Sequence, residues 1–236
     1  MSLDIIFISY NEPNAEENWE DLKSRFPYAL RVDMVDGIPE AFIEAARISK
    51  TSHVYTVDAD NKILPGFKFE YSPNYWDKDF VHLWYAHNPV NGLMYGYGGL
   101  KLWPRRFLKE AQIQEHSVDF TVPASHGGQG GLKIHETAAS ITCFNTSRFD
   151  SYRAGFREGA KLRAEIVNES YYHDITEAKE RLNIWCTQGE NKPFGRECMY
   201  GALDGRSYGE KYSVNPKKLS LINSFDFIRS QFQKYE

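Results

Sequence analysis

The chain has 236 residues, which is enough for one large α/β domain or for one domain with a small appendage. Hydrophobic residues make up 42% of the chain, so a packed core is expected, and no apolar run reaches the ~18 residues that a membrane-spanning helix needs. The net charge of −4 argues against broad, non-specific binding of nucleic acids but leaves room for a local basic groove.

The cysteines and the first residues bear on the compartment. Three cysteines, an odd number at wide spacing, fit a reducing compartment and provide no C-x-x-C metal site. The opening Met1-Ser-Leu-Asp-Ile-Ile has no basic stretch before its apolar residues, so the sequence predicts no secretory signal. We therefore expect a cytoplasmic protein with no membrane partner.

The first part of the chain alternates between strands and helices. Strands are predicted for residues 4–9, 28–33 and 53–60, and helices for residues 15–26 and 39–49. This alternation is typical of parallel βαβ units, which bind their ligands at the carboxyl edge of the sheet. The polar residues that follow these strands, and that we expect to converge there on a nucleotide, are Ser9, Tyr10, Asn11, Asp33, Asp36, Gly37 and Asp58.

The third strand stops on two carboxylates, Asp58 and Asp60. An ionised carboxylate is costly inside a buried strand, so both should lie where the strand leaves the sheet, and alternate residues of an extended chain should point the same way. Carboxylates at this place favour Mg²⁺ or Mn²⁺ that accompanies a diphosphate. Asp60 is the primary ligand in this interpretation, and Asp58 reaches the ribose or a metal-bound water.

The same spacing recurs at Asp77-Lys-Asp79. These residues follow Ser72-Pro-Asn-Tyr-Trp76, a turn-rich stretch with no strand before it, so the second pair is interpreted as a solvated turn. Thirteen aspartates in this length produce about one such pair by chance, so context and not spacing favours Asp58 and Asp60.

A strand-like run over residues 94–103 contains several glycines. Glycines within a strand suggest that a ligand or another backbone approaches closely, and Gly98 and Gly99 are therefore assigned to the donor site. Further along, a helix is predicted for residues 150–167, where Arg153 and Arg157 share one face. That face either contacts phosphate or is a solvated surface paired with nearby glutamates, and both interpretations stay open.

The rest of the chain, from residue 175, is predicted to be helical and ends in an amphipathic segment over residues 219–235. No internal repeat, low-complexity segment or clean linker separates it from the preceding part. We therefore divide the chain into an α/β catalytic domain, residues 1–165, and a helical C-terminal extension, residues 166–236, packed on the same domain.

A series of short motifs runs along nearly the whole chain, and their order is more specific than any one of them. The motifs are Phe7-Ile-Ser-Tyr-Asn-Glu-Pro-Asn-Ala15, Gly37-Ile-x-x-Ala41, Val57-Asp-Ala-Asp60, Gly98-Gly99, Ile134-His-Glu136, Phe144-Asn145, Arg153 with Phe156-Arg-Glu158, Glu180-Arg-Leu182 with Trp185-Cys186, and Leu219-Ser-Leu-Ile-Asn-x-Phe-Asp226. In this order they resemble glycosyltransferases of the GT-A fold, in particular the small glycosyltransferases of T4-like bacteriophages.

The resemblance implies a GT-A fold with a mixed sheet, a nucleotide-sugar donor and Mn²⁺ or Mg²⁺. In that fold a third metal ligand often comes from a histidine late in the chain, here His135 or His173, with His135 preferred. If the anomeric centre is inverted, a general base is needed, and the resemblance points to Glu136 with Asp119 in reserve. A retaining enzyme needs no such base, and the sequence does not decide between the two.

The resemblance also implies an acceptor. Members of the phage group are implicated in decorating 5-hydroxymethylated pyrimidines of phage DNA, which would place the protein in the host cytoplasm. Flipping a base out of a duplex costs a few kcal/mol, and stacking on Trp84, Tyr95 or Trp103 could offset this cost. The basic residues expected to flank the catalytic edge and contact DNA phosphates are Lys101, Arg105, Arg106, Lys109, Arg153, Arg157 and Lys161.

Other functions stay open. A glycosyltransferase acting on a glycan or a small molecule needs the same donor chemistry. A nucleotidyltransferase also uses paired carboxylates beside an α/β sheet, but it normally has a Gly-rich loop with a basic residue after the first strand, where this chain has Tyr10-Asn-Glu-Pro13. A non-catalytic carbohydrate- or DNA-binding protein could keep the same fold.

Overall fold

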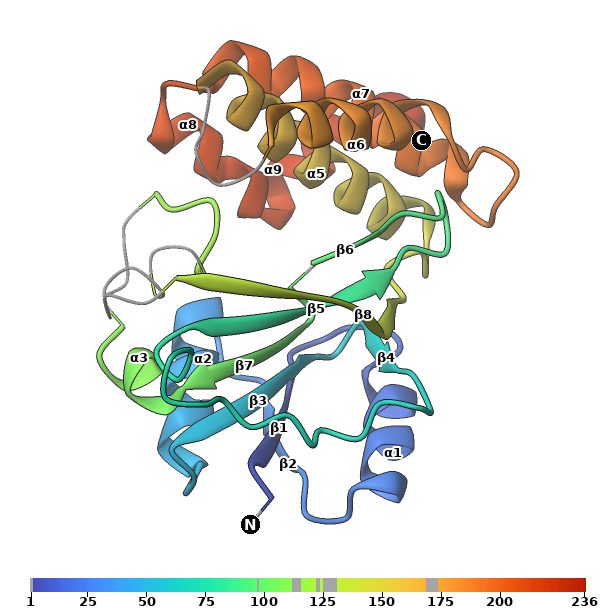
Figure 1. Ribbon diagram of the computed structural model, residues 1–236. Helices are drawn as coiled ribbons and strands as arrows, with labels where there is room; N and C mark the ends of the chain where they lie inside the picture. The colour runs from blue at the N-terminus through green and yellow to red at the C-terminus, as the bar shows by residue number, and fades with distance from the viewer. Residues whose placement is uncertain (1, 97, 112–115, 122–123, 125–130, 169–173) are drawn as a thin grey trace. The chain divides into compact units, whose positions relative to one another are not determined.

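The computed structural model describes residues 2–96, 98–111, 116–121, 124, 131–168 and 174–236 (Figure 1). The chain divides into two compact units. The sheet unit comprises residues 1–88, 94–114 and 119–143, and the helical unit comprises residues 89–93, 115–118 and 144–236. The helical part therefore begins at Phe144 and not at residue 166, because the long helix predicted for residues 150–167 groups with the later helices.

The sheet unit opens with alternating strands and helices, as the sequence predicts. Its strands are β1 (Asp4–Ser9), β2 (Leu30–Asp33), β3 (His53–Asp58), β4 (Asn61–Ile63), β5 (Val81–His87), β6 (Met94–Tyr95), β7 (Leu100–Pro104) and β8 (Leu132–Thr142). Its helices are α1 (Ala15–Arg25), α2 (Ile38–Ile48) and α3 (Arg105–Lys109).

These strands form one mixed sheet with the order β2-β1-β3-β7-β5-β8-β4, and β6 pairs with β5 (Figure 1). β1 is parallel to both β2 and β3, as the βαβ pattern predicts. β7 runs antiparallel to both of its neighbours, β3 and β5, whereas β8 is parallel to β5. The predicted α/β class with a mixed sheet is confirmed.

Helices cover both faces of the sheet (Figure 1). Successive side chains of a strand point to opposite faces, so Ile5 and Phe7 of β1 pack with Leu22 of α1, while Ile6 packs with Phe42 of α2. The central strands are therefore buried on both sides, which explains why they form nearly continuous apolar runs in the sequence.

α2 shows how local sequence sets the helix that follows β2. Gly37 precedes the helix with a φ of 96°, a left-handed backbone conformation that suits glycine. Pro39 lies in the first turn, where its missing N–H is no loss. Phe42, Ala45 and Ala46 form the buried face that packs on the sheet.

The helical unit contains α5 (Arg148–Asn168), α6 (Ile175–Thr187), α7 (Gly195–Tyr212), α8 (Pro216–Leu219), α9 (Phe225–Phe232) and the short 3-10 helices η1 (Ser220–Asn223) and η2 (Gln233–Tyr235). α5 and α7 pack backbone to backbone. A Cβ atom on Gly155 of α5 would collide with the backbone of Cys198, and one on Gly201 of α7 would collide with the backbone of Tyr152. Within the described segments, no helix has the length and apolar character needed to cross a bilayer.

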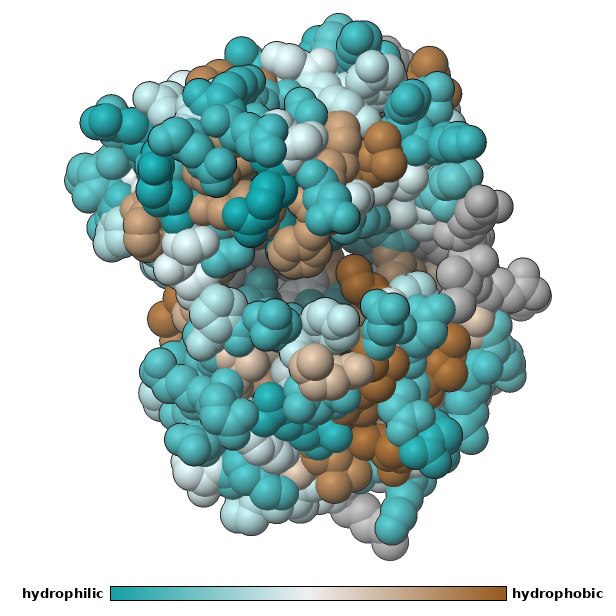
Figure 2. All heavy atoms as spheres, turned by 180° about the vertical axis from the view of Figure 1, so that it is seen from behind, coloured by the Kyte–Doolittle hydropathy of each residue, from teal (hydrophilic) through white to brown (hydrophobic). Residues whose placement is uncertain are grey.

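The surface is mainly hydrophilic in the view of Figure 2, with hydrophobic side chains gathered in smaller groups. In the sheet unit, Leu30, Met34 and Ile38 are exposed around β2, which has β1 as its one pairing partner among the described strands. Tyr75 and Trp76 are far more exposed, with 73% and 84% of their surface accessible.

Candidate functional site

The parallel strands bring the predicted polar residues to one edge of the sheet, here called the carboxyl edge. In the strand pairing Ser9 lies opposite Asp33, and Ile8 lies opposite Asp58, so the ends of β1, β2 and β3 are level. Because β7 is antiparallel to β3, its first residues reach the same edge. Gly99 and Lys101 therefore lie beside Asp58, as the hydrogen bond from the Asp58 N–H to the Gly99 carbonyl shows (2.8 Å).

Asp58 closes β3 beside the ammonium group of Lys101. The Lys101 Nζ lies 3.5 Å from Asp58 Oδ2, and the lysine side chain is 6% exposed whereas the aspartate side chain keeps 37%. Close packing of protein atoms around this carboxylate raises its pKa, Lys101 lowers it and the charge of Asp60 raises it, with the result that the pKa of Asp58 is about 6. Further positive charge at this edge would stabilise the ionised form.

Asp60 lies in the turn between β3 and β4, so the prediction that it continues an extended strand from Asp58 is wrong. Its Oδ1 accepts a hydrogen bond from Asn61 Nδ2 at 2.7 Å, and its carbonyl accepts one from the Cys143 N–H at 2.5 Å. Asn61 is buried and its Oδ1 accepts from the Ser140 hydroxyl at 3.0 Å. These contacts fix Asp60 at the carboxyl edge.

The glycine pair before β7 has a structural reason within the protein. A Cβ atom on Gly99 would collide with the carboxamide of Asn61. Gly98 has a φ of 85°, which favours glycine, and lies near the stem of Lys101. The close approach predicted from the sequence is therefore made by Asn61, next to Asp60, and it brings the Gly98–Gly99 backbone to the carboxyl edge.

Ser9 and Asp33 belong to a network around Arg31. The Ser9 hydroxyl donates to Asp33 Oδ1 at 2.6 Å, and Arg31 Nε donates to the Ser9 oxygen at 2.9 Å. The same guanidinium pairs with Glu16 at 2.7 Å and with Asp33 at 3.3 Å. Asp33 keeps 45% of its side chain exposed, so it can accept hydrogen bonds from ligand hydroxyls such as those of a ribose.

The remaining predicted donor residues of the sheet unit form an exposed rim. Tyr10 keeps 48% of its surface exposed and belongs to neither core cluster of the unit, and its N–H donates to Glu12 Oε2 at 2.9 Å. Asn11, Asp36 and Gly37 are also exposed and follow β1 and β2 directly. The ring of Tyr10 is thus available to a ligand at the carboxyl edge.

His135 is not brought to these carboxylates. Asn61, next to Asp60, pairs with Thr142 near the end of β8, whereas His135 pairs with Trp84, which puts the histidine about 20 Å away at ~3.3 Å per residue. His135 Nε2 instead lies 3.0 Å from His82 Nδ1. The predicted third-ligand role of His135 is therefore wrong. No group of three His, Cys, Asp or Glu among the described residues could hold a metal ion, and His173 lies outside them.

Glu136 is also far from Asp58 and Asp60, because it directly follows His135 on β8. It is exposed at an irregularity in the β5–β8 pairing, where partners shift from His135 to Ala138. Asp119 accepts a hydrogen bond from the Thr121 N–H at 2.6 Å in a local turn. The structure therefore does not bring Glu136 to Asp58, and the hydrogen bond from Thr121 to Asp119 is a local one.

Arg153 and Arg157 lie on α5 in the helical unit, where they contact other residues of that unit. The Arg153 guanidinium lies 4.0 Å over the ring of Phe225, and Arg157 donates to Asn223 Oδ1 at 3.1 Å. Lys161 forms an ion pair with Glu158. These side chains are thus engaged within the helical unit, and the pairing with a glutamate predicted for this face is seen at Lys161 among the described residues.

Three of the basic residues expected at the catalytic edge lie at the other end of the sheet. Pro104 of β7 pairs with His53 at the start of β3, while Leu100 pairs with Val57 near its end. Arg105, Arg106 and Lys109 follow Pro104 and therefore begin about 17 Å from Asp58, at ~3.3 Å per strand residue. Of the four residues predicted after the glycines, Lys101 alone reaches the carboxyl edge among the described contacts.

The rings expected to stack on a flipped base are in the core. Trp84, Tyr95 and Trp103 are 5%, 5% and 0% exposed. The indole N–H of Trp103 donates to the Thr56 hydroxyl at 3.0 Å, which satisfies its one polar atom. These rings stabilise the fold, and the prediction that they stack on a base is wrong.

The second Asp-x-Asp is a turn, but it is not solvated at Asp77. That side chain is buried and accepts hydrogen bonds from the Tyr71 hydroxyl and the Lys133 ammonium, each at 2.7 Å. Burial raises the pKa of Asp77, but these donors outweigh it and hold the pKa well below its usual range. Asp77 is a structural carboxylate.

Sequence reasoning missed Arg31, Asn61 and the role of Lys101. Arg31 and Asp33 are two apart on β2 and share a face, so their pairing was readable from the sequence. Lys101 stands between apolar residues of a strand, a sign that its charge needs a buried partner. Asn61 gave no signal, because its partner Ser140 is 79 residues away.

Neither a protein-family model nor a curated protein matches the chain.

Proposed function

We propose that the protein is a metal-dependent glycosyltransferase of the GT-A type, with its nucleotide-sugar donor at the carboxyl edge. The observation that carries the proposal is the position of Asp58 and Asp60 at the end of β3, level with Ser9 and Asp33 on parallel neighbours. Ligands of open α/β sheets bind outside the carboxyl ends of the strands, where the strand order changes direction. β1 is the first strand of the chain and lies between β2 and β3, so the strand order changes direction at β1. The carboxyl end of β1 therefore meets this condition for a ligand site.

The donor nucleotide would use the rim and the Arg31 network. Tyr10 offers an exposed ring to the base, and Asp33 offers a carboxylate to the ribose hydroxyls. Arg31 and the Ser9 hydroxyl hold Asp33 in one orientation, which lowers the cost of ordering it when a ligand binds. The Gly99 carbonyl accepts from the Asp58 N–H, so the Gly98–Gly99 backbone lies next to the carboxylates that would bind the metal and the diphosphate.

Asp58 and Asp60 fit a Mg²⁺ or Mn²⁺ ion that takes its other ligands from the donor. Mg²⁺ is commonly held by one or two carboxylates together with substrate phosphates, so two protein ligands suffice. The pKa of Asp58, raised to about 6, marks an edge where additional positive charge is favoured. When bound, the ion neutralises the charge of the departing diphosphate. Lys101 keeps Asp58 oriented from inside the sheet.

The proposed acceptor is a hydroxyl group, with a 5-hydroxymethylated pyrimidine of DNA as the preferred one because of the motif order. Glu136 is too far from Asp58 to act on an acceptor bound there, so we propose no side chain as general base. A glycan or small-molecule acceptor would use the same donor chemistry.

The test is release of nucleoside diphosphate from a panel of nucleotide-sugars, with and without Mn²⁺. A glycosyltransferase should show slow, Mn²⁺-dependent hydrolysis of its donor, and the matching donor should stabilise the fold by about 2.7 kcal/mol at 100 times its dissociation constant. Pyrophosphate release from a nucleoside triphosphate would identify a nucleotidyltransferase instead. Binding without turnover of any donor or triphosphate would identify a non-catalytic protein.

The acceptor is tested separately with a labelled donor. Transfer to duplex DNA that contains 5-hydroxymethylcytosine, and none to the unmodified duplex, is the expected result. Donor hydrolysis without transfer to either DNA would keep the glycosyltransferase and remove the DNA acceptor.

A further inference from the structure

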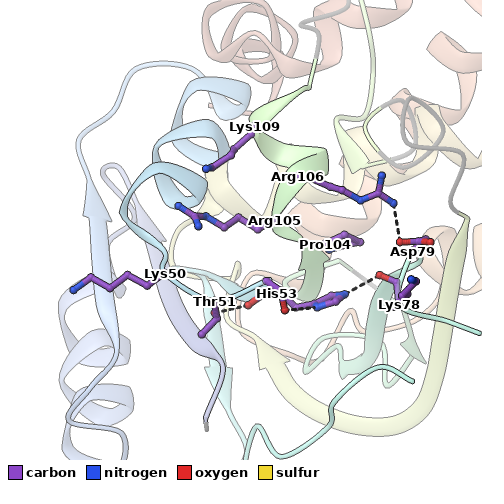
Figure 3. A pocket seen from close by; sticks show the side chains of 10 residues that line it. Lys50, Thr51, His53, Lys78, Asp79, Pro104, Arg105, Arg106 and Lys109 are labelled. Atoms are coloured by element: carbon purple, nitrogen blue, oxygen red, sulfur yellow. Dashed lines mark hydrogen bonds and ion pairs between the residues drawn. The ribbon is translucent and has the colours of Figure 1, made fainter. Parts of the chain in front are cut away.

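A cavity of about 700 Å³ opens at the other end of β3, in the sheet unit (Figure 3). We call it the amino-edge pocket, and its lining comes from the start of β3, the turn before β5 and helix α3. Five cationic side chains line it against one carboxylate, which is a strong local excess of positive charge in a chain of net charge −4. The charged lining residues are Lys50, Lys78, Arg105, Arg106, Lys109 and Asp79.

Most of this positive charge is not neutralised by described residues. Arg106 turns to Asp79 and pairs with it at 2.7 Å (Figure 3). The other four cations form no ion pair with any residue that the structure describes. Arg105 and Lys109 are four apart on α3 and their charged ends lie on the same side of it, an arrangement of like charges that destabilises a helix (Figure 3). A bound anion would relieve this repulsion.

The pocket is built on ordered backbone. His53 Nε2 donates to the Lys78 carbonyl at 2.7 Å, which ties the turn before β5 to the start of β3. The Arg105 N–H donates to the Ser52 carbonyl at 2.9 Å, and Arg105 Nε donates to the Ala46 carbonyl at 2.8 Å. The cations therefore project from positions that are fixed before any ligand arrives.

Two exposed aromatic rings closely precede the pocket residue Lys78 in the sequence. Trp76 and Tyr75 precede Lys78 by two and three residues, and they are the rings that are 84% and 73% exposed. Lys78 Nζ lies 4.8 Å over the Tyr75 ring. The turn that carries them is held by the buried Asp77, which accepts from the Asn74 N–H at 2.6 Å. Trp76 is thus held on a hydrogen-bonded turn. Two residues, or about 7 Å of extended chain, separate it from Lys78 of the pocket.

We propose that the amino-edge pocket and the Tyr75–Trp76 turn bind single-stranded nucleic acid. Phosphates lie against Lys50, Lys109 and Arg105, and a base stacks on Trp76. Proteins that bind single strands without sequence preference combine a cationic groove with exposed rings in this way. The proposal is independent of the glycosyltransferase, because it uses no residue of the carboxyl edge.

The exposed ring of Trp76 separates this ligand from other polyanions. A duplex keeps its base faces stacked inside, so it could use the cations but not the ring of Trp76. The surface of a bilayer could meet the exposed Lys50, Lys78 and Lys109 with its phosphates, but it has no base to stack on the ring of Trp76. An extended single strand can lie in the hollow and reach the ring with one base.

The test is fluorescence anisotropy with a labelled oligothymidylate over a salt series, without nucleotide-sugar or divalent ions. Each phosphate contact on a single strand contributes about 0.7 to the slope of log affinity against log salt, so Lys109→Ala should reduce the slope by about this amount. Lys68→Ala removes an exposed lysine of the same unit outside the pocket and serves as the matched control, with no change in slope expected. Equal slopes for the two variants would overturn the proposal.

The ring is tested in the same assay. Trp76→Ala should weaken binding about tenfold without changing the salt slope, and Trp76→Phe should retain most of the affinity because it keeps a stacking face. Equal binding of a duplex, with no effect of Trp76→Ala, would leave a phosphate-only site and overturn the single-strand proposal. Binding to vesicles rich in phosphatidylserine but not to the oligonucleotide would also overturn it. Asp60→Ala should bind the oligonucleotide like the unchanged protein, so a failed transfer assay does not affect this result.

Discussion

The two ends of β3 differ in charge, although they belong to one strand of six residues. Asp58 ends the strand among carboxylates, while His53 starts it beside a pocket with five cations. The net charge of −4 is a sum over the whole chain and describes neither edge. For a sheet protein, the position of a charge along the strand direction is therefore more informative about ligands than the total charge.

The edges also differ in how their charges are paired. At the carboxyl edge Asp58 faces Lys101, and Asp33 faces Arg31. At the amino edge Arg106 pairs with Asp79, and the other pocket cations have no ion pair among the described residues. Paired and oriented groups suit a small ligand with defined donors and acceptors, whereas unpaired long cations suit a diffuse polyanion.

If the carboxyl edge is catalytic and the amino edge is not, Asp60→Ala should reduce activity strongly. It is the substitution with the largest expected effect. Donor turnover should fall about a thousandfold, because stabilisation of a departing diphosphate contributes several kcal/mol, and added Mn²⁺ should not restore it. Steady-state assays of nucleoside diphosphate release measure the loss. Asp79→Ala, which removes a carboxylate from the other Asp-x-Asp, is the control and should stay active. Metal-dependent turnover in Asp60→Ala would move the site away from this edge.

The buried His82 and the half-buried His135, midway between the edges, predict a loss of stability in acid. Burial lowers the pKa of His82 to about 4, and burial also lowers that of His135. The pKa of His82 in the folded protein lies below its ordinary value near 6.5. Its contribution to the free energy of unfolding is therefore fully present above about pH 6.5 and is lost as the pH falls through 4. The loss should approach about 3 kcal/mol in urea unfolding at a series of pH values.

His82→Gln can keep a donor to the Asp77 carbonyl but cannot take up a proton, so it should flatten this acid dependence. His87→Gln on the same strand is the matched control. An unchanged acid dependence in His82→Gln would assign the acid loss to other groups.

Asp58 responds to pH in the opposite direction, which sharpens the contrast with the histidines. Its pKa of about 6 in the folded protein lies above the ordinary value of 3.8. Its favourable contribution to the free energy of unfolding is therefore present below about pH 3.8 and is lost as the pH rises through 6. Asp58→Asn removes this titration and should flatten the pH dependence of stability, but it also leaves the Lys101 ammonium, 6% exposed, without its carboxylate partner, so it should lower the stability at neutral pH. Thermal melting near pH 7 and near pH 4 should show a smaller difference between the two pH values in the variant than in the unchanged protein.

The smallest expected effect concerns the rim of the carboxyl edge. Tyr10→Ala should weaken donor binding about fivefold, at the low end of the range for stacking on a base because the ring is half exposed. Tyr10→Phe should bind like the unchanged protein. Isothermal titration with the donor measures both, and an unchanged affinity in Tyr10→Ala would leave only the backbone of this loop in contact with the nucleotide.

The elements that could be predicted from the sequence are those set by local pattern. Apolar runs and turn residues predicted β1, β3 and α2, and the rule for parallel strands brought Ser9, Asp33 and Asp58 to one edge. The antiparallel course of β7 depends on pairing with β3 and β5, and no local pattern encodes it. For this reason the position of Arg105 relative to Asp58 was out of reach.

The failures at single residues have a related cause. The sequence of a long strand does not show which of its halves reaches the carboxyl edge of the sheet. For this reason His135 and Glu136 of β8 were predicted to lie near Asp58, and that prediction is wrong. Aromatic residues look alike in sequence whether they are buried or exposed, so the rings predicted to stack on a base include the buried Trp84 and not the exposed Trp76. Both questions depend on distant contacts that only the folded chain defines.

The glycine contacts between α5 and α7 restrict which substitutions this chain can accumulate. Alanine ordinarily favours a helix over glycine by about 0.5–1 kcal/mol, but at Gly155 or Gly201 its methyl group would meet rigid backbone, and overpacking of this kind costs about 1–3 kcal/mol. In a library of variants selected for folding, these positions should stay glycine, while exposed neighbours on the same helix, such as Arg206, should accept many residues. The helical unit can therefore diverge widely over its outer surface while one stripe of glycines keeps its identity.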